Sequence, residues 1–266
     1  MSVSNAPNST FSFELFPPKS QEGMEKLAGN VRQLNAVAPE YFSVTYGAGG
    51  STRDRTFETV ALLRAQGIDT APHLSCIGSS RAEIRDILRH YREHGIHRIV
   101  ALRGDLPSGM GAGATGELRY ANELVELIRQ ETGGHFRIEV AAYPEFHPQA
   151  PSAERDLLNF KRKVEAGADA AITQYFYNAD AYFAFLDSCE RLGIDIPVIP
   201  GVMPITNYSQ LARFSDACGA EIPRWVRKRL AGYADDIESI RAFGHEVVAQ
   251  LCRRLLEGGA PGIHFY

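Results

Sequence analysis

The sequence predicts an α/β protein with a (β/α)8 barrel fold, and three observations lead to this fold class. Short apolar or β-branched runs recur along all 266 residues, each followed by a turn and then by apolar residues at helical spacing. The first four runs begin at Ser12, Tyr41, Thr70 and Arg98, spaced 28 to 29 residues apart, which is the length of a strand, a helix and two turns. Polar residues gather near the carboxyl ends of these runs, where such barrels assemble their active sites.

Eight runs have the length and composition of strands. The run at 99–102 is apolar at successive positions, as expected for a parallel strand that is covered on both faces. An open, doubly wound sheet is the alternative, but only a closed ring would direct polar groups from so many strand ends to one place. The predicted strands are residues 12–16, 41–46, 70–76, 98–103, 137–143, 170–177, 197–203 and 262–266.

Helices are predicted between the strands by their starts and their apolar faces. Ser80 followed three residues later by Glu83 has the spacing of a capping box, and Ile84, Ile87 and Leu88 then share one helical face. The interval between the last two strands is about twice the others and holds three helical patterns. These patterns, at 209–218, 223–231 and 238–257, predict an extra helix before the last strand.

Composition and charge limit which classes of protein this chain can belong to. With 44% hydrophobic and 23% charged residues, the chain has enough apolar material for one core, so we expect a single domain over 1–266 with a flexible N-terminus at 1–10. A net charge of −4 gives no broad positive field for nucleic acid. No apolar run has the length of a membrane helix, and no secretory signal precedes the first strand, so we expect a cytoplasmic protein. The four cysteines are scattered, which suggests neither a zinc site nor disulfides.

The first strand and the fourth end in groups that could do chemistry. Glu14 lies in an otherwise apolar run, where burial should raise its pKa and suit it to act as a general acid. A carboxylate paired with an arginine is the structural alternative. Arg103 and Asp105 flank Gly104, which would let the backbone approach a ligand closely. A simple ion pair would explain the same residues.

A helix after the fifth strand carries Asp156, Asn159, Arg162 and Lys163. Arginine and lysine match a pyrophosphate, while aspartate and asparagine match ribose hydroxyls, although the pattern alone also fits a solvated helix face. The segment 111–116 fits G-x-G-x-x-G, but no acidic residue follows at the spacing of a dinucleotide-binding fold, so we interpret it as a loop.

The strand ends also permit a competing function. His73, Asp105 and His147 could hold a metal ion together with Glu14, which would make the chain a metal-dependent barrel hydrolase. The first strand lacks an H-x-H pattern, so such a site would have to be assembled from separate strands. This hypothesis is the alternative to the one that follows.

Six strand-end motifs occur in one order: FELFPP at 13–18, SVTYGA at 43–48, APHL at 71–74, ALRGD at 101–105, AYPE at 142–145 and ITQYF at 172–176. In this order they resemble the methylenetetrahydrofolate reductase family, flavoproteins with a (β/α)8 barrel. The resemblance implies that FAD binds at the barrel mouth without a metal ion, accepts hydride from NADH or NADPH, and reduces 5,10-methylenetetrahydrofolate to 5-methyltetrahydrofolate. Its setting would be one-carbon metabolism and methionine synthesis.

The resemblance also implies roles for individual residues. Glu14 matches the family's general acid, and Asp105 matches an aspartate near the flavin and the pterin, where a negative charge would stabilise a cationic iminium. Gln174, Gln210 and Phe214 match positions that contact the substrate, as does Asp105. The implied FAD contacts are Thr45, Tyr46, Ala48, His73, Arg103, Gly104, Asp105, Tyr120, Tyr143, His147, Asp156, Asn159, Arg162 and Lys163.

The chain departs from the family pattern at its end. It stops at Tyr266, where the family continues into a final helix, so that helix is expected to be missing. A third hypothesis is therefore that the chain is a catalytically inactive binding subunit. We expect small-molecule substrates and a homo-oligomer, but no nucleic-acid or membrane partner.

Overall fold

The structure is a computed structural model that describes residues 9–46, 53–104 and 116–266. Its described residues fall into two compact units. The N-terminal unit comprises residues 11–141 and 162–171, and the C-terminal unit comprises residues 9–10, 142–161 and 172–266. The expected flexible N-terminus lies mostly outside the described residues, but Thr10 already belongs to the first strand.

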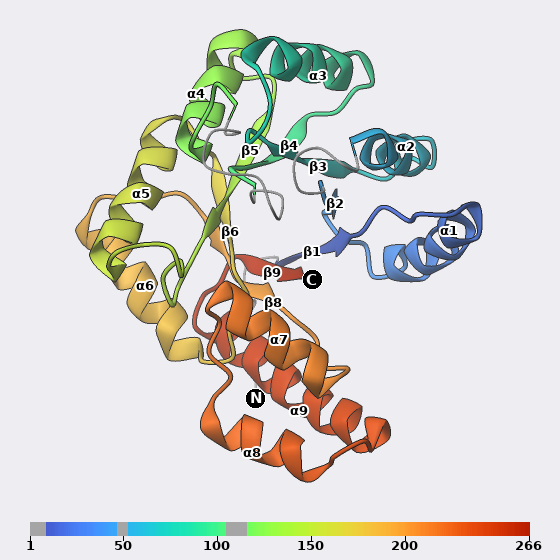
Figure 1. Cartoon of the computed structure of the whole chain (residues 1–266), viewed down its shortest axis with the longest axis vertical. Helices are drawn as coiled ribbons and strands as arrows, with labels where there is room; N and C mark the ends of the chain where they lie inside the picture. The colour runs from blue at the N-terminus through green and yellow to red at the C-terminus, as the bar shows by residue number, and fades with distance from the viewer. Residues whose placement is uncertain (1–8, 47–52, 105–115) are drawn as a thin grey trace, which may run out of the picture. The chain divides into compact units, whose positions relative to one another are not determined.

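The N-terminal unit alternates parallel strands and helices, and Figure 1 shows them in blue to green. Its strands pair in chain order, with Glu14 opposite Ser43 and Ser43 opposite Ala71. Strands β2 and β3 are buried along their whole length, as predicted for parallel strands covered on both faces. The elements are β1 (Thr10–Leu15), α1 (Gln21–Asn35), β2 (Tyr41–Val44), α2 (Arg53–Arg64), β3 (Thr70–Ser75), α3 (Arg81–Glu93), β4 (Arg98–Leu102), α4 (Ala121–Thr132) and β5 (Arg137–Ala142).

The capping box predicted at the start of α3 is confirmed. The backbone N–H of Glu83 donates to Ser80 Oγ at 3.2 Å, and the backbone N–H of Ser80 donates to the Glu83 carboxylate at 2.7 Å. The face formed by Ile84, Ile87 and Leu88 is buried, as its spacing predicted.

The remaining elements belong wholly or partly to the C-terminal unit. They are α5 (Ala153–Glu165), β6 (Ala170–Thr173), α6 (Ala179–Arg191), β7 (Val198–Ile199), β8 (Gly201–Val202), α7 (Tyr208–Cys218), α8 (Arg224–Gly232), α9 (Ile237–Glu257) and β9 (Gly262–Phe265). The three helical patterns predicted before the last strand are thus present as α7, α8 and α9, coloured orange to red in Figure 1.

The strand predicted at 197–203 is divided at Pro200 into β7 and β8. Proline has no backbone N–H to donate to a ladder, which explains the interruption. Strand β7 is the neighbour of β6, whereas β8 pairs with β9. The two halves of this one predicted strand therefore stand at the two ends of the strand order, β7-β6-β5-β4-β3-β2-β1-β9-β8. This order and the alternation with helices confirm the predicted (β/α)8 fold class.

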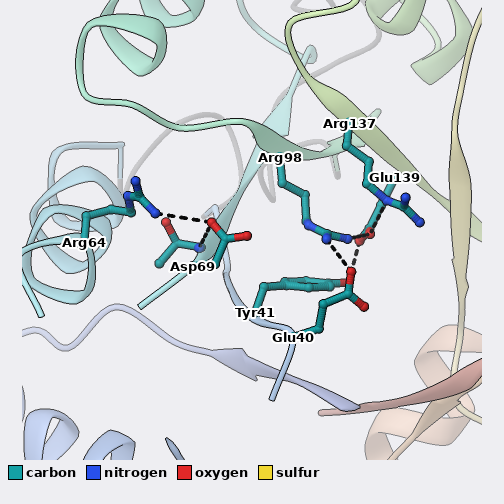
Figure 2. A network of polar contacts seen from close by, with 8 residues as sticks. Glu40, Tyr41, Arg64, Asp69, Arg98, Arg137 and Glu139 are labelled. Atoms are coloured by element: carbon teal, nitrogen blue, oxygen red, sulfur yellow. Dashed lines mark hydrogen bonds and ion pairs between the residues drawn. The ribbon is translucent and has the colours of Figure 1, made fainter. Parts of the chain in front are cut away.

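A buried ionic network occupies the amino ends of the strands in the N-terminal unit (Figure 2). Arg98 donates to Glu139 at 2.6 Å and to Glu40 at 2.5 Å. The Tyr41 hydroxyl donates to the other oxygen of Glu139, and the Arg98 guanidinium lies over the Tyr41 ring. Barrels use this end for stability rather than chemistry, so we assign the network to folding.

Two expectations about composition can be compared with the structure. All four cysteines are free, in agreement with the absence of a predicted disulfide framework. Within the described ranges, no helix combines the length and the apolar character needed to cross a bilayer.

Candidate active site

Glu14 and His73 form the centre of the candidate site in the N-terminal unit. Glu14 Oε2 lies 3.4 Å from His73 Nε2, and each side chain is only 10% exposed. The pair joins β1 to β3, although β2 lies between these strands. The arrangement brings together a predicted general acid and a predicted cofactor contact.

The end of β2 is held by backbone hydrogen bonds. The Thr45 N–H donates to Leu15 O at 2.9 Å, and Thr45 O accepts a hydrogen bond from Thr56 Oγ1 at 2.8 Å. The neighbouring Tyr46 is half-buried, and burial raises the pKa of its phenol. Both residues thus lie on a fixed strand end, while the predicted contact Ala48 lies outside the described residues.

The fourth strand ends in a tightly packed turn. Arg103 O accepts hydrogen bonds from Ser75 Oγ at 2.8 Å and from the Ile77 N–H at 2.9 Å. Gly104 has φ +85°, and a Cβ added there would lie 1.9 Å from Ser75 Oγ. Ser75 on β3 therefore requires a glycine at this position, whether or not a ligand also approaches it. Asp105, the second predicted catalytic residue, lies outside the described residues.

Tyr120 precedes α4 in the N-terminal unit and is 58% exposed. The backbone N–H groups of Arg119 and Tyr120 both donate to the Glu123 carboxylate, which fixes the start of the helix. An exposed aromatic ring on a fixed backbone is suited to stack on a flat ligand.

The four predicted contacts on α5 have different surroundings. Asp156 accepts a hydrogen bond from the His147 N–H at 2.9 Å, whereas Asn159 and Arg162 are exposed. Lys163 Nζ donates to Ala141 O on β5 at 2.5 Å. The ammonium predicted to bind a pyrophosphate is thus directed at a strand carbonyl in this structure.

The loop after β5 carries two predicted cofactor contacts in the C-terminal unit. The rings of Tyr143 and His147 are 4.7 Å apart and nearly perpendicular. His147 Nδ1 accepts a hydrogen bond from the Gln149 N–H at 3.0 Å, so the neutral ring carries its hydrogen on Nε2. The loop therefore presents an N–H donor beside an aromatic face.

Glu145 is a residue of this loop to which the sequence analysis assigned no role. Its carboxylate accepts a hydrogen bond from the Glu221 N–H at 2.8 Å, and burial raises its pKa. Glu221 follows α7, so the contact joins the loop after β5 to the segment after α7. A small pocket lies beside it, lined by residues that include Tyr143, Gln174 and Cys218. The sequence shows Glu145 as a carboxylate at a strand end, but it does not indicate that the backbone of Glu221 is its partner.

Two predicted substrate contacts lie one helical turn apart on α7. Gln210 and Phe214 are both exposed, and the Gln210 N–H donates to the capping Asn207 side chain at 2.9 Å. Residues four apart share a helix face, so α7 presents an amide and an aromatic ring side by side.

The metal-site hypothesis gains no support from the described part of the chain. There, no group of three or more His, Cys, Asp or Glu residues is placed to hold a metal ion. His73 and His147 belong to different units, and Asp105 is not described.

Comparison with known proteins decides between the two hypotheses. A family model for methylenetetrahydrofolate reductase matches residues 2–266. The 5,10-methylenetetrahydrofolate reductase of Escherichia coli (strain K12) is 42% identical over 256 residues, covering 96% of this chain and 84% of that protein. The chain belongs to the methylenetetrahydrofolate reductase family. It is therefore an oxidoreductase, and the resemblance of its six motifs is confirmed.

A less similar relative and a solved structure are consistent with this family and its fold. The methylenetetrahydrofolate reductase (NADH) 1 of Arabidopsis thaliana is 35% identical over 277 residues, covering 100% of this chain and 47% of that protein. A solved structure from Clostridium thermocellum, described as binding two copies of 5-methyl-5,6,7,8-tetrahydrofolic acid, has a TM-score of 0.69. It is 19% identical and covers 98% of this chain and 89% of its own, which supports the fold of this reductase family member.

Proposed function

We propose that this chain reduces 5,10-methylenetetrahydrofolate to 5-methyltetrahydrofolate with FAD as cofactor and NADH or NADPH as the electron donor. Family membership supports the reaction, and a plant relative named for NADH supports a nicotinamide donor. The observation that carries the proposal is the Glu14 carboxyl, held 3.4 Å from His73 and almost excluded from water. The metal-dependent hydrolase is not proposed, because the chain belongs to a reductase family.

The residues assigned to FAD have the chemistry that this cofactor needs. Tyr120 offers an exposed aromatic ring, Arg162 an exposed cation and Asn159 an exposed amide, while His147 offers a ring N–H. Lys163 would contribute only after exchanging the carbonyl of Ala141 for a phosphate oxygen. When bound, FAD would supply hydride transfer between the nicotinamide and the folate. The other assigned contacts, Thr45, Tyr46, Ala48, His73, Arg103, Gly104, Asp105, Tyr143 and Asp156, are proposed on the same family resemblance.

The protein's own residues would manage the proton and orient the substrate. Glu14 would hold a proton on its carboxyl oxygen and give it to a folate nitrogen, so that the methylene bridge opens. A site with little water keeps Glu14 protonated until the folate binds, because a nearly buried carboxyl holds its proton more tightly than an exposed one. Asp105 would stabilise the cation that results. Phe214 would pack against the substrate, and Gln174 and Gln210 would hydrogen-bond to it.

Further expectations depend on this function. We propose that the protein works in the cytoplasm in one-carbon metabolism and methionine synthesis, with small-molecule substrates. We also propose a homo-oligomer and a single catalytic domain over 1–266.

The first test is the visible spectrum of the purified protein before and after anaerobic NADH or NADPH. We expect a flavin spectrum that bleaches with the nucleotide and returns on addition of methylenetetrahydrofolate. Glu14→Gln should retain FAD and its reduction by the nucleotide, but lose folate reduction by at least about 100-fold, the usual scale of general acid catalysis.

The matched control is Glu22→Gln, which changes an exposed carboxylate on α1 and should leave both half-reactions unchanged. A colourless protein that takes up no added FAD would contradict the proposed function. Full folate turnover by Glu14→Gln would remove Glu14 from its assigned role.

A further inference from the structure

Glu14, Ser43 and His73 lie on one face of the sheet in the N-terminal unit. Residues paired in register on neighbouring parallel strands point to the same face, and Glu14 is paired with Ser43, which is paired with Ala71. His73 follows Ala71 by two residues and therefore returns to that face. Ser43 thus occupies the middle strand between the two members of the candidate acid pair.

The contact between Glu14 and His73 passes over β2. Strands that flank a common neighbour are about 10 Å apart, yet Glu14 Oε2 reaches within 3.4 Å of His73 Nε2. The two side chains therefore extend toward each other across the face of β2, on the side where Ser43 lies. A change of rotamer could bring its carboxyl to the Ser43 hydroxyl.

The Ser43 hydroxyl is buried and makes no hydrogen bond to the described residues. Ser43 is 0% exposed, and its Oγ has no hydrogen-bond partner among the described residues. Other buried strand serines are engaged: Ser75 donates to Arg103 O, and Ser12 hydrogen-bonds to Tyr41. A buried hydroxyl without a partner is costly, which points to a partner in another state of the protein.

We propose that Ser43 is a positioning residue for Glu14, whose carboxylate accepts a hydrogen bond from the Ser43 hydroxyl once its proton has passed to the substrate. This inference rests on the proposed function. In the transfer, the O–H bond of Glu14 breaks and an N–H bond forms on the substrate, with no change in oxidation state. Ser43 stabilises the negative charge left on Glu14 and so makes Glu14 a stronger acid.

The test compares Ser43→Ala with a matched variant, Thr70→Val. Thr70 is also 0% exposed and its Oγ1 also lacks a partner among the described residues, but it is paired with Phe42 and so lies on the opposite face. Infrared difference spectroscopy of the substrate-free protein follows the titration of the Glu14 carboxyl, which is assigned by its loss in Glu14→Gln.

We expect Ser43→Ala to move the Glu14 titration upward by about 1 to 2 pH units, because a hydrogen bond to the charged form is lost. The pH profile of folate reduction should move in the same direction, while reduction of the protein by the nucleotide stays unchanged. Thr70→Val should leave both titration and profile at their wild-type positions, and Ser43→Thr, which keeps the hydroxyl, should restore them.

An unchanged Glu14 titration in folded Ser43→Ala would overturn the inference. If that variant does not fold, Ser43→Cys takes its place, because a thiol is a weaker donor and should produce a smaller upward shift. A protein that reduces no folate but shows the shift would contradict the proposed function and still support the link between Ser43 and Glu14.

Discussion

At the scale of single residues, close approach of backbone and side chain decides what each position tolerates. Gly104 combines a left-handed φ of +85° with a site in which a Cβ would overlap Ser75 Oγ. Ser75 in turn donates to Arg103 O, so the strand end and its neighbour fix one another. The conformation at Arg103 and Gly104 thus depends on contacts with Ser75 on β3 as well as on β4.

We expect Gly104→Ala to lower the free energy of unfolding by about 1 to 3 kcal/mol, because it strains the backbone and displaces Ser75. Gly29→Ala on α1 is the control: a Cβ there meets nothing within 4 Å, and alanine should stabilise the helix by about 0.5 to 1 kcal/mol. Urea unfolding of both variants measures the difference. If Gly104→Ala raised the free energy of unfolding as much as Gly29→Ala, the contact between the new Cβ and Ser75 would be relieved at little energetic cost.

At the scale of elements, Glu145 connects the loop after β5 to the segment that follows α7, the helix of Gln210 and Phe214, within the C-terminal unit. Its hydrogen bond from Glu221 ties the loop of Tyr143 and His147 to the segment that follows α7. Cys218, the last residue of α7, hydrogen-bonds to the Tyr175 hydroxyl close to this contact. Opening of the segment should therefore be detectable as a change in the reactivity of Cys218.

We expect Glu145→Ala to increase alkylation of Cys218 by iodoacetamide several-fold, because the Glu221 N–H loses its acceptor. Glu145→Gln keeps a carbonyl oxygen as acceptor and should remain close to wild type. Mass spectrometry of the labelled peptides quantifies each site, with Cys252 as the internal reference. Burial raises the pKa of Cys189 to about 12, so this thiol should stay unlabelled at pH 8 in every variant. The same Cys218 labelling in both Glu145 variants would show that the hydrogen bond between Glu221 and Glu145 does not hold the segment after α7 closed.

At the scale of the whole molecule, stability depends on a charged network that unites three strands of the N-terminal unit (Figure 2). Arg98 on β4 pairs with Glu139 on β5, which also accepts the hydroxyl of Tyr41 on β2. The Glu139 side chain is only 1% exposed, so its charge depends on these partners.

We expect Arg98→Met to lower the free energy of unfolding by about 3 kcal/mol, because it leaves the buried Glu139 charge with only the Tyr41 hydroxyl and the more distant Arg137, at 3.8 Å, as partners. Arg89→Met breaks the exposed ion pair with Asp86 on α3 and should cost less than about 1 kcal/mol. Chemical denaturation of the two variants provides the comparison. A similar small loss in both would mean that Glu139 is protonated or hydrated once Arg98 is gone.

Much of the fold could be predicted because its units repeat. Each strand is an apolar run and each helix has its own periodic face, so the order of elements follows from local patterns. The division of one strand at Pro200 was missed, although proline itself was the signal. The helices between the last two strands were predicted within a residue or two of their observed bounds.

The candidate site was less predictable, since its residues meet across the sheet. The sequence marked Glu14 and His73 as strand-end groups but not as a contacting pair. The hydrogen bond from the Lys163 ammonium to Ala141 O was not predicted either. The hydrogen-bond partner of a long side chain depends on which groups the folded chain brings near it.

The sequence by itself therefore determined the alternation of strands and helices, the family and the strand ends that carry polar groups. Only the tertiary structure decided that Ser43 lies between Glu14 and His73, that Glu145 accepts a hydrogen bond from Glu221, and that Gly104 is required by Ser75. Local periodicity fixes which face a side chain occupies along its own element. Register and contact between distant segments depend instead on packing the whole chain, which brings together groups that no spacing in the sequence relates.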